Sequence, residues 1–199
     1  MSLENIKFLK GKILPQSDKF SKKYVFSDLY IIFRHATFKL SRLGGLLLRT
    51  CDSLRIDPQT LVIHPIFEGP MKTHIISTHG TYTSKVSQLE LLNLACMRYF
   101  STYEGRIRAS RFQMEFHKKT PLLIAENSIE AFPTKSPSNP ECMWIFNHSF
   151  RVKFHTTKSS ILYYDNGLEI VVNASIHTIE KQRSRMIMMI YKQKSLIRN

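Results

Sequence analysis

The chain has 199 residues, of which 43% are hydrophobic, so it is long enough for one packed domain with room for an extension. Its 29 Lys and Arg residues against 15 Asp and Glu give a net charge of +14, which indicates a polyanionic partner, either nucleic acid or an anionic membrane surface. A generally lysine-rich proteome is the alternative explanation. No uncharged apolar run approaches the roughly 20 residues that span a bilayer, which excludes a membrane-spanning protein.

The three cysteines lie far apart, at Cys51, Cys96 and Cys142, and no CxxC pair is present. A zinc ribbon is therefore not expected, and we predict no metal and no cofactor. An odd number of cysteines without a secretory signal favours a cytoplasmic protein with free, buried thiols.

Residues 1–50 are denser in positive charge than the remainder. They hold ten Lys or Arg and three Asp or Glu, a net +7, and residues 51–199 hold 19 and 12, also +7. The apolar clumps at 24–26 and 29–33 match neither the helix period nor the strand period. We therefore expect residues 1–50 to be a basic N-terminal extension, or the product of a start site assigned in error.

A hairpin and a helix are the first elements predicted after residue 50. Residues 61–63 and 74–76 are short β-prone runs separated by a turn at Glu68-Gly69-Pro70. Ser87 followed by Glu90 fits a capping box, and apolar residues then recur at helical spacing. The pattern predicts a helix from about 87 to 100, ended by Tyr103-Glu104-Gly105.

The second half of the chain predicts strands and a closing helix. Strands are expected at 122–125, 144–146 and 150–154, and residues 161–164 and 168–172 form a hairpin. Asn166-Gly167 between them suits the positive φ angles of a type I′ turn. Ser175 is placed to cap a helix to about residue 194. The expected fold class is thus α+β: small antiparallel hairpins with a central and a C-terminal helix.

Basic residues are concentrated between residues 98 and 119 and alternate with aromatic ones. The guanidinium group of arginine can form bidentate hydrogen bonds to phosphate or enter a narrow minor groove of DNA. Aromatic rings can pack against sugars and bases or insert between bases. A solvated charged face is the alternative. The DNA-binding candidates in this segment are Arg98, Arg106, Arg108, Arg111, Lys118 and Lys119. Lys135, which lies further along the chain in residues 132–144, is a seventh candidate.

Enzymatic activity is not expected, and no catalytic residue is assigned. The chain has no HExxH or GxSxG motif, no glycine-rich phosphate loop and no closely spaced carboxylate pair. His148 and His155 are an odd number of residues apart, which places them on opposite faces of a strand.

The segment FPTKSPSNPECMW at residues 132–144 combines turn residues with aromatic ends, and its joint spacing resembles the bacterial competence transcription factor family, ComK. Its matching residues are Phe132, Pro133, Thr134, Ser136, Pro140, Cys142 and Trp144. A second block is also similar, with matches at Cys96, Tyr99, Tyr103, Gly105 and Arg106. Within it, Met97 stands where the family has arginine and Phe100 where it has glycine. The resemblance covers about residues 56–193.

The resemblance implies a DNA-binding transcriptional activator of DNA-uptake genes, with residues 51–199 as the DNA-binding domain. It implies binding to paired AT-rich promoter boxes as an oligomer, largely through the minor groove. It also implies RNA polymerase and a proteolytic adaptor as further partners, and association with the nucleoid. The alternatives are an RNA-binding or ribosome-associated protein, or a nuclease.

Two segments have an expected role and a structural alternative. Within the loop, Phe132 and Trp144 are expected to anchor the chain while Thr134, Lys135 and Ser136 project as phosphate donors; the loop is equally consistent with a purely structural role. The run from 186 to 191 is apolar on all sides of the last helix. Either it packs in the core, or it forms an oligomer interface through Met186, Ile187, Ile190 and Tyr191.

Overall fold

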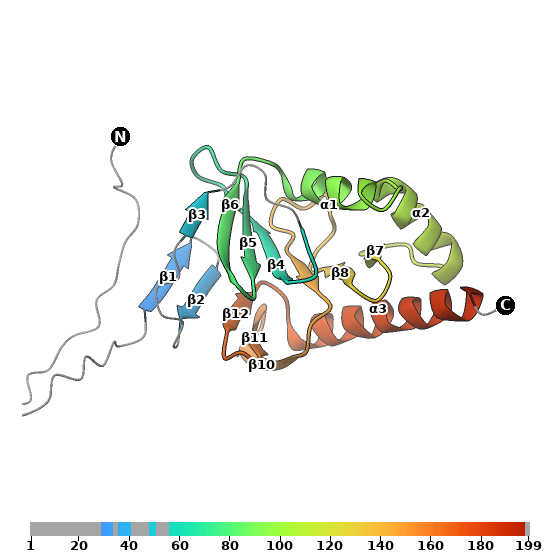
Figure 1. Ribbon diagram of the computed structural model, residues 1–199. Coiled ribbons are helices and arrows are strands. Elements are labelled where there is room, and N and C mark those ends of the chain that lie inside the picture. The colour runs from blue at the N-terminus through green and yellow to red at the C-terminus, as the bar shows by residue number, and fades with distance from the viewer. Residues whose placement is uncertain (1–28, 34–35, 41–47, 51–55, 198–199) are drawn as a thin grey trace, which may run out of the picture.

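The structure is a computed structural model that describes residues 29–33, 36–40, 48–50 and 56–197 (Figure 1). These residues form two β-sheets and three α-helices, which confirms the α+β class. None of the described helices is long and apolar enough to cross a membrane.

One sheet has seven strands in the order β3-β6-β5-β4-β9-β8-β7. The predicted hairpin is confirmed as the antiparallel pair β4–β5, and a strand that sequence reasoning missed, β6, extends it. The pair β3–β6 is parallel and the other pairs are antiparallel. The strands are β3 (Leu48–Thr50), β4 (Thr60–Pro65), β5 (Thr73–Ser77), β6 (Gly80–Ser84), β7 (Leu122–Ala125), β8 (Ile129–Pro133) and β9 (Trp144–Phe146).

The second sheet has five strands in the order β1-β2-β12-β11-β10, all antiparallel. Among residues 1–50, the described strands β1 and β2 join this sheet and β3 joins the other, although the apolar pattern at 29–33 had matched no strand period. Whether residue 50 is a domain boundary remains a prediction. The strands are β1 (Leu29–Phe33), β2 (Ala36–Leu40), β10 (Phe150–Thr156), β11 (Ser159–Tyr164) and β12 (Glu169–Val172).

The β11–β12 hairpin is confirmed, but its turn is not type I′. Gly167 has a φ of 81°, whereas Asn166 is not among the residues with positive φ. The Gly167 N–H donates to the Tyr164 carbonyl at 3.0 Å, and the Asn166 side chain accepts from the Leu168 N–H at 3.1 Å. The loop therefore has three residues, and it needs the left-handed conformation only at Gly167.

The central helix is shorter than predicted, and a second helix follows it. Helix α1 spans Gln88–Met97, and the predicted cap is confirmed because the Ser87 hydroxyl accepts from the Glu90 N–H at 3.3 Å. Helix α2 spans Tyr103–Met114 and so begins where sequence reasoning placed a break. Its cap is Thr102, whose hydroxyl accepts from the Gly105 N–H at 3.0 Å. Gly105 therefore starts a helix instead of ending one.

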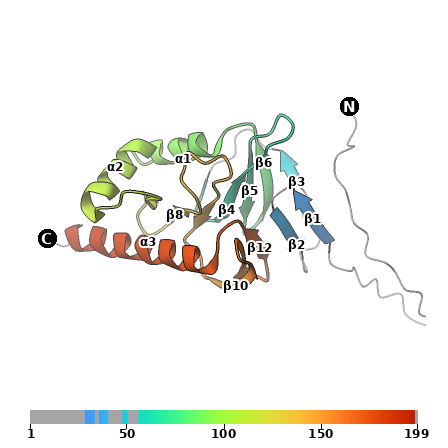
Figure 2. The ribbon, with the colours of Figure 1, turned by 180° about the vertical axis from the view of Figure 1, so that it is seen from behind.

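The C-terminal helix is confirmed with nearly the predicted bounds. Helix α3 spans Ile176–Ile197, and the Ser175 hydroxyl accepts from the Thr178 N–H at 3.3 Å. In both ribbon views, α1 and α2 cover one side of the seven-stranded sheet and α3 runs along the other (Figures 1 and 2).

Apolar residues on the central strands are buried on both faces, which creates two cores. On β4, Val62 belongs to the core beneath α3, while Ile63 belongs to the core beneath α1 and α2. On β9, Ile145 and Trp144 divide in the same way. This two-sided burial holds the strands that carry the ends of the 132–144 loop, henceforth the motif loop, in a fixed position.

Candidate nucleic-acid interface

Helix α2 presents its basic side to solvent. Ile107 and Ser110 are its buried residues, so the apolar contact with the sheet is confined to one narrow stripe. Arg108 and Arg111 are exposed, and Phe112, four residues after Arg108, has 82% of its surface exposed. Residues three and four apart are neighbours on a helix surface, so these three side chains form one exposed cluster.

The motif loop is fixed at both ends by buried aromatic residues, as predicted. Phe132 on β8 and Trp144 on β9 are each almost completely buried. The ring of Trp144 meets the ring of Tyr103 at 83°, with 6.1 Å between centroids. Because Tyr103 is the first residue of α2, this contact joins the basic helix to the end of the motif loop.

Thr134 does not project from the motif loop, which favours the structural alternative for this residue over a role as phosphate donor. It is buried, and its hydroxyl accepts from the Met143 N–H at 3.0 Å and donates to the Asn173 side-chain oxygen at 3.0 Å. The Asn173 amide in turn donates to the Glu141 carbonyl at 2.7 Å. Thr134 therefore braces the loop, because buried backbone groups require hydrogen-bond partners.

A groove with a volume of about 500 Å³ lies between α2 and the tip of the motif loop. Arg108 and Arg111 line it on the helix side, and Ser136 and Ser138 line it on the loop side, with their hydroxyl oxygens 2.9 Å apart. Glu104 is the acidic residue of the lining. Guanidinium groups facing hydroxyls across an open groove suit a phosphate ester backbone.

The seven cationic candidates differ in whether their charged groups form hydrogen bonds or ion pairs within the protein. Arg108 and Lys118 are exposed, and neither has a hydrogen bond or an ion pair with another described residue. Arg111 is exposed but donates through Nε to the Thr120 hydroxyl at 3.2 Å. In these three residues, most or all of the charged group's donors face solvent, which leaves them available to a ligand.

The other four candidates make contacts within the protein. Arg98 donates to the Ile56 carbonyl, and Arg106 donates to the Tyr99 carbonyl at 3.0 Å. Lys119 donates to the Thr134 carbonyl at 3.0 Å, and Lys135 forms an ion pair with Glu141. Lys135 is half-buried, so this motif-loop lysine does not project freely as predicted.

Two arginines of α3 are structural. The guanidinium of Arg183 lies 4.7 Å from the ring centre of Phe150, and that of Arg185 lies 4.1 Å from the ring centre of Phe116. Arg185 also donates to the Lys119 carbonyl at 3.2 Å, and burial lowers its pKa. These cations brace α3 against β10 and against the chain that follows α2.

The predicted oligomer residues divide between core and surface. Met186 is only 1% exposed, so its place in an oligomer interface was wrong and the core alternative holds; Ile190 is partly buried against the same core, and its interface role stays a prediction. Ile187, Met188 and Tyr191 are exposed, with Tyr191 at 71%. The helix period of 3.6 residues separates the two sets, which sequence composition cannot do for a run that is apolar throughout.

The two described cysteines and Tyr103 are held in their neutral forms. The thiols of Cys96 and Cys142 are free and buried, and burial raises the pKa of each to about 11. Burial likewise raises the pKa of Tyr103 to about 12. Within the part of the chain that the structure describes, no group of three or more His, Cys, Asp or Glu residues is arranged to hold a metal ion.

Sequence reasoning missed a buried histidine pair at the heart of the seven-stranded sheet. His64 on β4 faces His74 on β5, and their ring nitrogens are 2.7 Å apart. Burial lowers the pKa of His64 to about 4, although its bond to the Pro65 carbonyl acts in the opposite direction, and burial holds the pKa of His74 well below its usual value. The sequence does contain a signal for this pair. The residues directly before and after each histidine are apolar or β-branched, which is typical of a buried strand.

Comparison with known proteins agrees with the motif loop and the block around α2. The family model described as "ComK protein" matches residues 52–198, about three quarters of the chain. The chain belongs to the ComK family. It is also 24% identical over 135 residues to the Competence transcription factor of Bacillus subtilis (strain 168), covering 66% of this chain and 70% of that protein. No solved structure matches it.

The ComK match ends at residue 198 and thus includes α1, α2, the motif loop and α3. The matched region does not include β1, β2 or β3. In this chain, β1 and β2 belong to the five-stranded sheet and β3 belongs to the seven-stranded sheet. The residues that line the groove therefore all lie within the family region.

Proposed function

We propose that this protein is a transcriptional activator of competence genes that binds AT-rich duplex DNA through the groove between α2 and the motif loop. The observation that carries the proposal is Arg108, which is exposed, lacks an internal partner among the described residues, and lines the groove beside Arg111 and the loop hydroxyls. Membership of the ComK family and the net charge of +14 support it from independent directions.

The minor groove is the proposed point of contact. AT tracts have a narrow minor groove whose negative potential attracts arginine side chains, and Arg108 with Arg111 offers two of them three residues apart on one helix. Ser136 and Ser138 are then placed to donate hydrogen bonds to phosphate oxygens at the groove edge. A distamycin-type minor-groove ligand should compete with the protein, and methylation in the major groove should have little effect.

We further propose that the active form is a homo-oligomer. The exposed residues Ile187, Met188 and Tyr191 of α3 form an apolar patch that a second copy would cover. Two or more copies would read paired boxes, and the DNA-bound assembly would act on RNA polymerase at the promoter, in the cytoplasm at the nucleoid.

A binding assay with three probes tests the proposed function. Fluorescence anisotropy should give the highest affinity for an AT-rich duplex, a lower one for a GC-rich duplex of equal length, and the weakest for single-stranded RNA. A parallel incubation with Mg²⁺ or Mn²⁺ should leave the duplex intact. Preference for RNA would indicate the RNA-binding alternative, and metal-dependent cleavage would indicate a nuclease.

A further inference from the structure

Phe100 combines an unfavourable backbone conformation with complete exposure. Its φ is 54°, in the left-handed region that bulky side chains rarely adopt, and its side chain is fully exposed, at 101% of the reference surface. Its N–H donates to the Met97 carbonyl at 3.1 Å, and the Ser101 N–H donates to the Cys96 carbonyl at 3.2 Å, so Phe100 ends α1 at a position that suits glycine.

Among the residues that the structure describes, no contact explains the aromatic ring at this position. A fully exposed side chain contributes no burial, and the left-handed backbone carries a cost that glycine or asparagine would reduce. Strained residues of this kind are typical of functional sites, where the surrounding structure enforces the conformation.

The turn that carries Phe100 is firmly held. Arg106, on the first turns of α2, donates to the Tyr99 carbonyl at 3.0 Å. The Tyr103 N–H donates to the Asn93 side chain of α1 at 3.0 Å. The exposed ring therefore stands on a support fixed to both helices, which reduces the entropy lost when it engages a partner.

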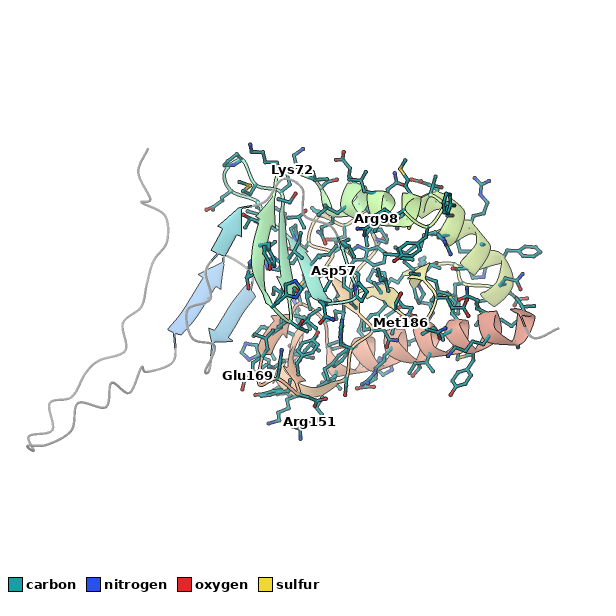
Figure 3. All side chains as sticks on the ribbon, viewed as in Figure 1. Asp57, Lys72, Arg98, Arg151, Glu169 and Met186 are labelled. Atoms are coloured by element: carbon teal, nitrogen blue, oxygen red, sulfur yellow. The ribbon has the colours of Figure 1, made fainter. Side chains whose placement is uncertain are left out.

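The chemistry around the ring indicates a nucleic-acid partner. Met97 and Tyr99 are exposed beside it, and the sequence from Met97 to Tyr103 contains Arg98 and no acidic residue. An exposed apolar side chain next to a basic residue is complementary to a duplex, which has a stacked apolar interior and an anionic backbone. Arg98 and the α1–α2 junction lie on the side of the molecule away from Arg151 on β10 (Figure 3).

We infer that Phe100 is a wedge that inserts between base pairs of the bound duplex and kinks it. This inference rests on the proposed function, because it requires that the protein binds DNA on this side. The wedge partly unstacks one base step, and the bent DNA can then follow more of the protein surface. Phe100 is thus a residue for DNA distortion, whereas Arg108 and Arg111 supply charge.

The test measures DNA bending and base unstacking with four proteins. A duplex with donor and acceptor dyes at its ends reports bending, and a duplex with 2-aminopurine at candidate steps reports unstacking. The proteins are wild type, Phe100→Gly, Phe100→Leu and Phe154→Ala, the last of which removes an exposed aromatic ring from β10.

Wild type should bend the duplex and raise 2-aminopurine fluorescence. Phe100→Gly should lose both signals and bind about fivefold or more weakly, the lower end of the effect of losing one base–aromatic stack. Its Tm should be unchanged or higher, because glycine accepts the left-handed backbone. Phe100→Leu retains an apolar wedge and should bend DNA, and Phe154→Ala should behave as wild type.

Three results would overturn the inference. If Phe100→Gly bends and binds DNA as the wild type does, Phe100 is not a wedge, and the proposed function is unaffected. A change in the mass of the DNA-free Phe100→Gly protein in sedimentation would instead assign Phe100 to a protein interface. Absence of DNA binding by wild type would refute both the proposed function and the inference.

Discussion

Tyr103 and Trp144 meet edge to face, with their ring centres 6.1 Å apart, and so connect the first residue of the basic helix to the last residue of the motif loop. Trp144 is buried and Tyr103 is partly buried. The contact joins the two elements that carry Arg108, on the helix side of the groove, and Ser136, on the loop side. Tyr103 itself also lines the groove, so DNA affinity should depend on this contact.

Replacement of Tyr103 tests this connection. Tyr103→Leu should lower the free energy of unfolding by about 1 kcal/mol, since an aromatic pair contributes roughly 0.5–1.5 kcal/mol beyond its buried area. It should also weaken DNA binding, because the groove loses its fixed width. Tyr103→Phe keeps the ring and is the matched control. Urea denaturation and anisotropy measure the two effects, and wild-type affinity in Tyr103→Leu would show that the spacing is set elsewhere.

The brace at Thr134 predicts a stability effect at a position for which the sequence pattern left a projecting and a structural role open. Thr134→Val removes an acceptor from the buried Met143 N–H and should cost about 1–3 kcal/mol, the usual penalty for an unsatisfied buried group. Thr134→Ser keeps the hydroxyl and should lose much less. Urea denaturation of both variants measures the two losses of stability. Equal urea midpoints for Thr134→Val and Thr134→Ser would show that the hydrogen bonds contribute little.

Exposed and buried positions of α3 should respond differently to a charge. Ile187→Glu combined with Tyr191→Glu places charge on the exposed apolar patch and should yield a folded protein of lower mass. Met186→Glu places the same charge in the core and should unfold the protein. Sedimentation equilibrium and circular dichroism separate the two outcomes. Unchanged mass in the double variant would mean that the patch is not the oligomer contact.

The histidine pair predicts a loss of stability in mild acid. His64 donates through Nδ1 to the Pro65 carbonyl, which leaves its Nε2 to accept from His74, so the His64 ring must be neutral, and burial keeps the His74 ring neutral as well. The folded pKa of His64 is about 4, below the value of 6.5 expected in the unfolded chain. The unfolded state therefore binds protons first, and stability present above pH 6.5 is lost as the pH falls toward 4.

The size of this effect is up to about 3 kcal/mol for His64, since each pKa unit corresponds to about 1.4 kcal/mol. His64→Gln should weaken the dependence of the urea midpoint on pH between 6.5 and 4. His177→Gln, which changes an exposed histidine on α3, is the control and should keep the wild-type profile. A flat wild-type profile in this window would contradict the buried neutral pair.

The elements that sequence reasoning predicted are those with strong local signals. Ser87 with Glu90 and Ser175 with Thr178 are caps within single turns, and both helices start there. Helix α2 was missed because it buries few residues and because Gly105 was taken as a break. An added Cβ at Gly105 would lie 3.1 Å from the Thr102 hydroxyl, so this glycine makes room for the cap that starts the helix.

The candidate site was only partly predictable, because the partners that decide it are distant in sequence. Lys119 and Lys135 look like surface cations, yet they bind a loop carbonyl and a carboxylate. The Thr134 hydroxyl donates a hydrogen bond to the side chain of Asn173, which lies 39 residues away in sequence. Arg108 and Lys118 have the same local appearance and stay exposed. Tertiary contacts, which periodicity does not report, separate these cases.

The salt dependence of DNA affinity in a charge-matched pair of variants tests the central claim most directly. Arg108→Gln with Arg111→Gln removes two positive charges from the groove, and Arg151→Gln with Lys153→Gln removes two from β10. Each phosphate that the protein no longer neutralises lowers the slope of log K against log salt by roughly 0.9, so the groove variant should lose up to about two units with little change in Tm. The β10 variant should keep nearly the wild-type slope. Equal slopes in the two variants, or a larger loss in the β10 variant, would contradict the assignment of the interface to α2 and the motif loop.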